Sequence, residues 1–194
     1  MQRICICGNI EGDLKTIVQS VEWKHEDLGE LEILILLLED RRFFQHSGID
    51  IASIGREILK FCTFQKYGGA STIDMQYVRM RTGYYERSLG RKLYEMLLAY
   101  LLQKRMDKVS ILRAYMQEVY LGSHIYGVER GARVMFNKAR YELSRAESAQ
   151  IAAMMVYPRP LHPDAAWQCR VARRAEYGLR LFEAYGHEYT RRSD

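Results

Sequence analysis

The stretch Glu30-Leu-Glu-Ile-Leu-Ile-Leu-Leu-Leu-Glu39 decides the fold class of this chain. Its unbroken apolar run, Ile33 to Leu38, is too short to cross a bilayer, which requires about 20 residues. A run of this length fits either a buried helix or a buried strand. Its leucine content and the charges at both ends favour a helix. We therefore predict a mostly buried helix that ends at a carboxylate pair, Glu39 and Asp40.

Helix signals continue along the rest of the chain. All three prolines fall between Pro158 and Pro163, so the first 157 residues lack the strongest helix breaker. Ser144 and Glu147 match a capping box, and the helix that it opens is expected to run to Tyr157. A last amphipathic helix is expected from Asp164 to about Tyr185. Apolar residues at helical spacing place two more helices: Ile51, Ile54, Ile58, Leu59 and Cys62 in one, and Leu89, Leu93, Met96, Leu97, Tyr100 and Leu101 in the other.

These signals predict a single, mainly helical domain that covers residues 1–194. Residues 1–29 and 186–194 are expected to be peripheral to it, with a loose tail. The glycine-rich stretches Tyr67–Ala70 and Leu121–Gly127 are expected to form turns between helices. The sequence indicates neither a signal peptide nor a transmembrane segment in this chain.

Composition narrows the classes of function. Apolar residues make up 48% of the chain and charged residues 27%, which excludes a wholly disordered protein. The net charge of +5 suits an anionic partner, whether a nucleic acid, an anionic membrane surface or a phosphate-bearing substrate. The four cysteines form no C-x-x-C pair, and no histidine cluster accompanies them, so a structural zinc site is not expected.

The first segment whose residues could carry catalytic chemistry is the end of the predicted apolar helix. Partial desolvation by Ile35 and Leu36, one turn earlier, would raise the pKa of Glu39 and make it a better base near neutral pH. Nearby cations at positions 41, 42 and 46 would lower that pKa again or orient the carboxylate. The alternative is a helix end whose acidic pair meets these cations in a surface network.

Two further segments carry polar groups at informative spacing. Gly68 and Gly69 precede Ser71 and Thr72, which suggests a turn that leads into a helix N-terminus, where backbone N–H groups bind phosphate. The alternative is an ordinary N-cap. Further along, Arg87, Arg91 and Glu95 follow one another at i, i+4 and i+8, and would form one stripe on a helix. Such a stripe suits a cleft wall that binds phosphate, or simple salt bridges.

In this order the segments resemble the five motifs of the family 51 glycosyltransferases. These are the glycosyltransferase domains of bifunctional penicillin-binding proteins and the monofunctional transglycosylases. The resemblance covers about residues 30–185. It rests on Glu39 to Phe43 with His46, Gly48, Ile49 and Asp50; Gly68 to Gln76; Arg91 to Glu95; Tyr126 to Val128 with Gly131, Ala132 and Phe136 to Lys138; and Glu147 to Ala153 with Pro158 and Pro163.

The resemblance implies a lysozyme-like fold with a large head lobe and a small, membrane-facing jaw at about residues 51–67. It also implies a peripheral position on the outer face of the bacterial cytoplasmic membrane. The jaw would reach lipid headgroups through apolar and cationic residues, a composition that suits such a surface. The residues concerned are Ile54, Arg56, Ile58, Leu59, Lys60, Phe61, Phe64 and Lys66. The oligomeric state is left open.

The substrate implied by the resemblance is lipid II, a disaccharide-peptide on undecaprenyl pyrophosphate. It would be added to a growing glycan chain through β-1,4 links, with inversion and release of undecaprenyl pyrophosphate. Glu39 would be the catalytic base. Glu95 would lie by the diphosphate and hold a basic residue or a divalent metal such as Mg or Mn, and no organic cofactor is implied. The implied substrate-binding residues are Asp40, Phe43, His46, Ser71, Thr72, Gln76, Arg79, Arg87, Arg91 and Lys92.

The sequence departs from the family pattern at several positions. Asp74 stands where Thr is usual, and this extra anion would repel a phosphate unless a cation balanced it. Gln103 replaces a usual Glu, and Asn137 replaces a glycine, although Asn also tolerates a left-handed backbone. Both motif glutamates are present.

Three other functions remain as alternatives to the polymerising enzyme. One is a non-catalytic module that binds lipid II or another polyprenyl pyrophosphate. A second is a lysozyme-like enzyme that cleaves glycan, although such an enzyme would not need a cluster of arginines for phosphate. A third, a nucleic-acid binder, lacks any dense run of Lys and Arg or any known motif, so no nucleic-acid partner is expected.

Overall fold

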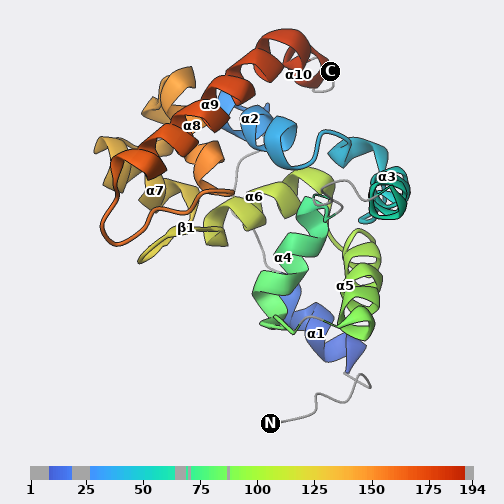
Figure 1. Ribbon diagram of the computed structural model, residues 1–194. Coiled ribbons are helices and arrows are strands. Elements are labelled where there is room, and N and C mark those ends of the chain that lie inside the picture. Colours follow the sequence, from blue (N-terminus) through green and yellow to red (C-terminus); the bar gives the residue numbers. More distant parts are fainter. Residues whose placement is uncertain (1–8, 19–26, 64–68, 70, 87, 191–194) are drawn as a thin grey trace. The chain divides into compact units, whose positions relative to one another are not determined.

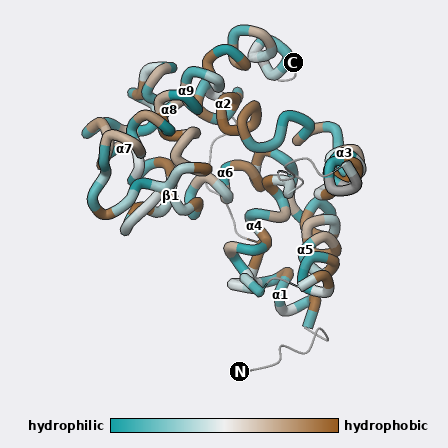
Figure 2. Tube along the Cα trace, in the orientation of Figure 1, coloured by the Kyte–Doolittle hydropathy of each residue, from teal (hydrophilic) through white to brown (hydrophobic). Residues whose placement is uncertain are grey.

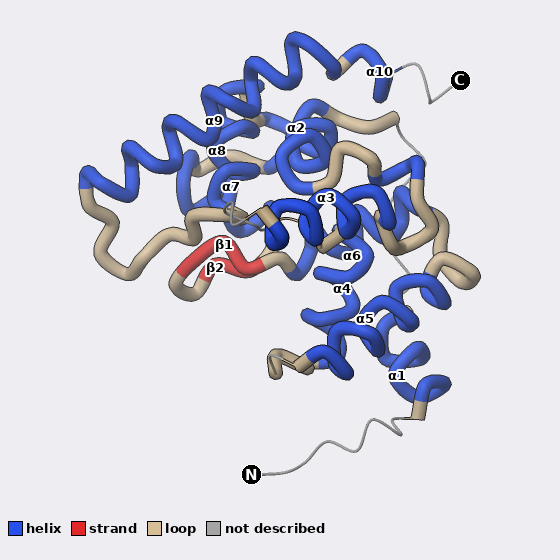
Figure 3. The backbone as a smooth tube through the Cα atoms, turned by 45° about the vertical axis from the view of Figure 1, so that its right-hand side comes forward, coloured by secondary structure: helices blue, strands red, loops and turns tan. Residues whose placement is uncertain are grey.

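The computed structural model describes residues 9–18, 27–63, 69, 71–86 and 88–190 (Figure 1). Helices dominate these ranges, and the described strands form one short antiparallel pair, red in Figure 3. The predicted mainly helical fold is therefore confirmed. No helix in these ranges is long and apolar enough to cross a bilayer. Two compact units make up the chain: the first contains residues 1–22 and 42–115, and the second contains residues 23–41 and 116–194.

Helices α1 (Ile10–Ile17), α3 (Ile51–Cys62), α4 (Ile73–Thr82) and α5 (Leu89–Leu102) build the first unit. It also contains the short 3-10 helix η1 (Phe43–Gln45) and the beginning of α6 (Lys108–Glu118). Helices α4 and α5 pack against each other, and α1 packs against both.

Helix α1 is part of the core of the first unit, which the sequence did not lead us to expect. Leu14 and Ile17 are buried, and the side chain of Asn9 caps the helix by accepting a hydrogen bond from Gly12 N–H. The hydroxyl of Tyr77 donates to the Ile17 carbonyl oxygen at 2.9 Å. The hydroxyl of Tyr94 donates to Asp13 at 2.7 Å. These polar contacts join α1 to α4 and α5.

The N-terminus of α4 is tied to the segment that follows η1. Thr72 is the N-cap of α4, and its hydroxyl accepts a hydrogen bond from Met75 N–H and donates to the Gly48 carbonyl oxygen at 2.7 Å. Gly48 has φ +84°, and a Cβ at this position would lie 2.5 Å from the Ala99 carbonyl oxygen. Only glycine can adopt this backbone conformation so close to α5.

The second unit is built on α2 (Glu30–Glu39), α8 (Arg145–Met154) and α9 (Ala165–Tyr185), which pack against one another. Every residue of α2 from Leu31 to Leu38 is buried, and this helix is among the most hydrophobic parts of the trace (Figure 2). The second unit also contains β1 (Tyr120–Gly122), β2 (Ile125–Tyr126), α7 (Val128–Phe136), η2 (Arg140–Glu142) and α10 (His187–Thr190).

The predicted helices of the second unit are found, with three differences. Helix α2 has the predicted bounds, α9 begins after its N-cap Asp164, and the Ser144 capping box opens α8, which ends at Met154 rather than Tyr157. The glycine-rich stretch after Tyr120 forms a β-hairpin instead of a plain turn. Of the expected loose tail, residues 189–194, Tyr189 and Thr190 belong to α10, where the Tyr189 hydroxyl donates to the Arg41 carbonyl oxygen at 2.8 Å, and residues 191–194 lie outside the described residues.

Gly48→Ala tests the tight approach of the first-motif segment to α5. We expect this change to lower the free energy of unfolding by about 1–3 kcal/mol, because it adds a steric clash to a strained φ. Gly55→Ala is the matched control, since nothing lies within 4 Å of its added Cβ. Within α3 that change should stabilise by about 0.5–1 kcal/mol. Urea unfolding of both variants measures the difference, and equal effects would contradict the described packing.

Candidate active site

The first unit holds a carboxylate surrounded by cationic side chains. Among the described residues, Arg79, Arg91 and Lys92 all contact Glu95, which is 3% exposed. Arg79 donates two hydrogen bonds, from Nε to Oε2 at 3.1 Å and from Nη2 to Oε1 at 2.8 Å. Lys92 Nζ donates to Oε1 at 3.0 Å, and Arg91 Nη1 donates to Oε2. We call these four residues the Glu95 cluster.

The Glu95 cluster depends on the pairing of α4 with α5. Arg79 comes from α4, whereas Arg91, Lys92 and Glu95 come from α5, so the fold brings the arginine to a carboxylate 16 residues away in the sequence. Burial alone would raise the pKa of Glu95, but hydrogen bonds and charges from Arg79 and Lys92 outweigh it and hold the pKa below its usual 4.5. Glu95 is therefore ionised at neutral pH.

Three cations around one carboxylate leave an excess of positive charge. The hydrogen bond to Glu95 raises the pKa of Arg79. Burial lowers the pKa of Lys92, against the opposing effect of Glu95. The side chains of Arg79 and Lys92 are 30% and 28% exposed, so a ligand in solution can contact both of them. The Glu95 cluster is suited to bind a polyanion such as a diphosphate.

Ser71 and Gln76 lie in the same unit and retain hydrogen-bonding capacity. The Ser71 hydroxyl accepts a hydrogen bond from Lys92 Nζ at 3.0 Å, and its proton remains for another acceptor. The Gln76 carbonyl oxygen accepts from the Tyr115 hydroxyl at 2.9 Å, which directs its amide N–H₂ elsewhere. Thr72 differs, because it is 2% exposed and its hydroxyl already serves Met75 and Gly48. Thr72 therefore acts as the cap of α4, and its predicted contact with substrate stays a prediction.

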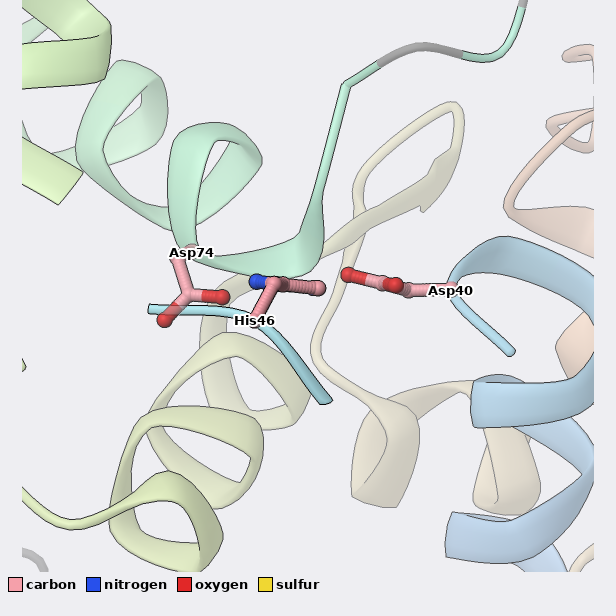
Figure 4. Close-up of side chains that lie close together, drawn as sticks. All are labelled: Asp40, His46 and Asp74. Atoms are coloured by element: carbon pink, nitrogen blue, oxygen red, sulfur yellow. The ribbon is translucent and has the colours of Figure 1, made fainter. Parts of the chain in front are cut away.

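The segment after η1 lies beside the first turn of α4. A ring nitrogen of His46 and a carboxylate oxygen of Asp74 lie within 4.8 Å of each other (Figure 4). Asp74 is fully buried, and it accepts hydrogen bonds from Lys108 Nζ at 3.1 Å and from Gln103 Nε2 at 2.7 Å. The cation that an extra anion at position 74 requires is therefore Lys108. Phe43 is also fully buried, and its predicted contact with substrate stays a prediction.

Glu39 and Asp40 end α2 in the second unit. One cation beside Glu39 in this unit is Arg174 of α9, whose Nη2 lies 3.7 Å from Oε1 and donates to the Leu38 carbonyl oxygen at 2.7 Å. Arg41 instead stacks on the ring of Tyr185, 4.2 Å from the ring centre. The sequence pointed to the neighbouring arginines and missed Arg174, which follows Glu39 by more than a hundred residues.

The predicted roles of the site residues all stay predictions, and for two of them the structure gives no geometry. Arg87, the first member of the predicted stripe, lies outside the described residues. The pairing of Glu39 with Glu95 in one site would join the two units, and neither unit by itself tests it. What the first unit brings together is Arg79, Arg91, Lys92, Glu95 and Ser71.

The contacts of Glu95 favour a basic residue over a divalent metal as its partner. Both carboxylate oxygens already contact cationic groups. A divalent ion would have to displace an arginine or lysine and would meet strong repulsion from the others. Of the two expected partners for Glu95, a basic residue or a metal, the geometry favours the basic residue.

Comparison with known proteins adds an independent finding. A family model described as transglycosylase matches residues 21–182. Penicillin-binding protein 1A of Rickettsia typhi is 37% identical over 150 residues, which are 75% of this chain and 19% of that protein. Penicillin-binding protein 1A of Aquifex aeolicus is 39% identical over 137 residues, 68% of this chain and 19% of that protein.

A smaller relative is known from Cupriavidus necator. Its name assigns it provisionally to the transglycosylases, and it is 37% identical over 136 residues, 70% of this chain and 59% of that protein. The chain thus spans about a fifth of the length of the penicillin-binding proteins that it matches. Fold and matches together define the class of protein as a mainly helical glycosyltransferase domain. Within that class, the chain belongs to the transglycosylase family.

Glu95→Gln tests the ion cluster. The change removes the shared counter-charge of three cations, and we expect it to lower the free energy of unfolding at pH 7 by about 3 kcal/mol, at the low end for a broken buried pair. Because the folded pKa of Glu95 lies below 4.5, its stabilisation is complete above that pH and declines as the pH falls further. The deficit of the variant should therefore shrink below about pH 4.5.

The control for this experiment is Glu86→Gln, which removes an exposed carboxylate between α4 and α5. Its stability should stay close to that of the wild type at every pH. Urea unfolding at a series of pH values measures both variants. A pH-independent deficit for Glu95→Gln would show that Glu95 is not ionised within the cluster.

Proposed function

We propose that this chain is a peptidoglycan glycosyltransferase that polymerises lipid II into β-1,4-linked glycan, with inversion and release of undecaprenyl pyrophosphate. The observation that carries the proposal is the Glu95 cluster, which presents excess positive charge of the kind that a leaving diphosphate needs. Membership of the transglycosylase family supports the same class of reaction.

The leaving group explains why so many cations gather around one carboxylate. When the bond between the anomeric carbon and the diphosphate breaks, negative charge develops on the phosphate oxygens. Arg79 and Lys92 would neutralise that charge by direct contact. Arg91 and the predicted Arg87 would contribute further positive charge. Glu95 would hold the cations in place before the substrate arrives, so little reorganisation is needed during the reaction. This arrangement distinguishes the proposed reaction from hydrolysis of a glycan, which releases no phosphate.

The acceptor sugar must lose a proton as it attacks. In this proposal Glu39 accepts the proton of the acceptor 4-hydroxyl, and Asp40 helps to orient it. Arg174 lies close enough to Glu39 to fix the carboxylate, at 3.7 Å, while its hydrogen bond to the α2 backbone anchors the guanidinium. Attack from the face opposite the diphosphate inverts the anomeric centre.

The remaining polar groups would bind the sugars and phosphates. Ser71 retains a proton to donate, and Gln76 retains its amide N–H₂. Phe43 and Thr72 would support the site indirectly, since both side chains are buried. The growing glycan and lipid II are the proposed partners.

Polymerisation by the purified chain tests the proposal. Labelled lipid II in detergent should yield a ladder of long glycan on a gel, and Glu39→Gln should reduce its rate by at least about 100-fold, the usual effect of losing a general base. The control is Glu176→Gln, which removes an exposed carboxylate of α9 in the same unit and should leave the rate unchanged.

Each alternative function has its own result in this assay. Tight binding of lipid II without any ladder would replace the enzyme with a binding module. Release of soluble fragments from preformed glycan would identify a glycan-cleaving enzyme. A full ladder from Glu39→Gln would leave the polymerase in place and remove Glu39 from its mechanism.

The first unit also has a surface suited to a lipid bilayer. On α5, Leu89, Leu93, Leu97 and Tyr100 are all exposed and recur at one face of the helix, with Leu89 at 76%. On α3, in the segment proposed as the jaw, Ile51 and Leu59 are exposed as well. Just beyond α5, the Lys104 ammonium lies 5.1 Å from the centre of the Tyr100 ring.

Charge favours anionic lipid as the partner of this surface. The acidic residue of α5 is Glu95, which is buried in its cluster, so the charges that α5 offers to solvent are cationic. Apolar side chains with cations and a tyrosine at the edge are typical of interfacial helices. We therefore propose that the chain associates peripherally with the membrane, at the outer face of the cytoplasmic membrane as the family resemblance implies.

Leu93→Glu tests the lipid-facing stripe of α5. It should reduce binding to vesicles of anionic phospholipid about tenfold, because a buried leucine contributes about 1.5–3 kcal/mol. Tyr141→Glu is the control, since it adds the same charge at an isolated exposed ring of the second unit. Vesicle flotation measures both variants. Equal binding by both would remove α5 from the membrane contact.

A further inference from the structure

The ammonium of Lys108 occupies a position where several functional groups of the first unit meet. Its Nζ lies 3.1 Å from Asp74 Oδ2, 3.5 Å from His46 Nδ1 and 4.1 Å from the centre of the Phe43 ring. Both Asp74 and Phe43 are fully buried. Lys108 is thus a cation held against the segment that carries His46, in contact with an anion, an imidazole and an aromatic face.

The charge of Lys108 is balanced inside the unit. Asp74 receives the ammonium at one carboxylate oxygen and the Gln103 amide at the other, so neither oxygen is left without a donor. Its place in the first turn of α4 adds the favourable helix dipole. The Phe43 ring face attracts the same ammonium. With these partners Lys108 can stay charged at low exposure.

The contact between Lys108 and His46 bears on which ring nitrogen of the imidazole carries the proton. An ammonium group has donors and no acceptor. A proton on Nδ1 would point at the positive charge 3.5 Å away, whereas a lone pair there is attracted to it. The contact with Lys108 therefore favours the neutral tautomer that carries its proton on Nε2, in which that nitrogen is a hydrogen-bond donor.

We propose that Lys108 is a positioning residue, which holds His46 in the Nε2–H tautomer so that its ring donates a hydrogen bond to a sugar or phosphate oxygen of the substrate. Lys108 itself acts through His46, and Asp74 acts through Lys108. The part of the proposal that concerns substrate rests on the proposed function, whereas the tautomer does not.

Nitrogen-15 NMR of the folded, substrate-free chain tests the tautomer directly. The two ring nitrogens of a neutral histidine differ strongly in chemical shift according to which one carries the proton, and His46→Asn identifies the signals. The wild type should show an unprotonated Nδ1. Lys108→Arg, which keeps a cationic donor, should preserve that pattern. Lys108→Met should move the shifts toward a mixture of tautomers.

In Lys108→Met the buried carboxylate of Asp74 loses its cationic partner, and this loss destabilises the fold. A second variant therefore keeps the test informative if Lys108→Met does not fold. Asp74→Asn/Lys108→Met removes both charges together and leaves the buried pair neutral. It should fold and show the same mixture of tautomers. The control is Lys15→Met, the same charge change on the exposed side of α1, which should leave the His46 shifts as they are in the wild type. A protonated Nδ1 in the wild type, or an unchanged tautomer in the double variant, would overturn the proposal.

The polymerisation assay distinguishes a failure of the proposed role of Lys108 from a failure of the proposed function. In the polymerisation assay, the double variant should lose about 10- to 100-fold in kcat/KM, as expected when a contact group is misplaced. Lys108→Arg, which keeps the cationic donor, should retain most of the wild-type kcat/KM. If the wild type makes no glycan, the proposed function fails, and the NMR result still stands for Lys108. If the tautomer changes but kcat/KM does not, the role of His46 toward substrate fails.

Discussion

The first unit depends on one interaction, the carboxylate of Glu95 shared among Arg79, Arg91 and Lys92. Because Arg79 comes from α4 and the other residues from α5, the cluster forms only when these helices pack together. Without Glu95, three cations would repel one another at close range. With it, they remain fixed and still carry net positive charge. The same interaction therefore serves folding and prepares a site for an anion.

Part of the fold could be predicted from local sequence signals. Helix α2 has a long apolar run between charges, and α8 and α9 begin at side chains that cap them, so residues near in sequence define all three. The hairpin after Tyr120 could not be predicted in this way, because Leu121 and Ser123 hydrogen-bond to the distant backbone of Arg159, which also lies close against Gly122. Helix α1 was missed for a similar reason: its short apolar face has meaning only once α4 and α5 cover it.

The candidate site likewise contains contacts that local spacing predicts and contacts that only the fold creates. Arg91 and Glu95 could be paired from their spacing of four residues, which places them on one helix face. Arg174 beside Glu39 and Lys108 beside Asp74 could not, because no sequence period joins residues so far apart. Asp74 and Gln103 had appeared as two separate departures from the family pattern. The structure shows that they hydrogen-bond to each other, so the two departures lie within one polar pair.

We propose that the Glu95 cluster binds the diphosphate of a substrate whose sugar is attacked with the help of Glu39. A crystal structure of the chain with a lipid-linked disaccharide diphosphate would test this proposal. We expect phosphate oxygens within hydrogen-bonding distance of Arg79 and Lys92, about 2.7–3.2 Å, and Glu39 facing the acceptor hydroxyl. A diphosphate bound away from the Glu95 cluster, with Arg79 and Lys92 still in contact only with Glu95, would contradict it.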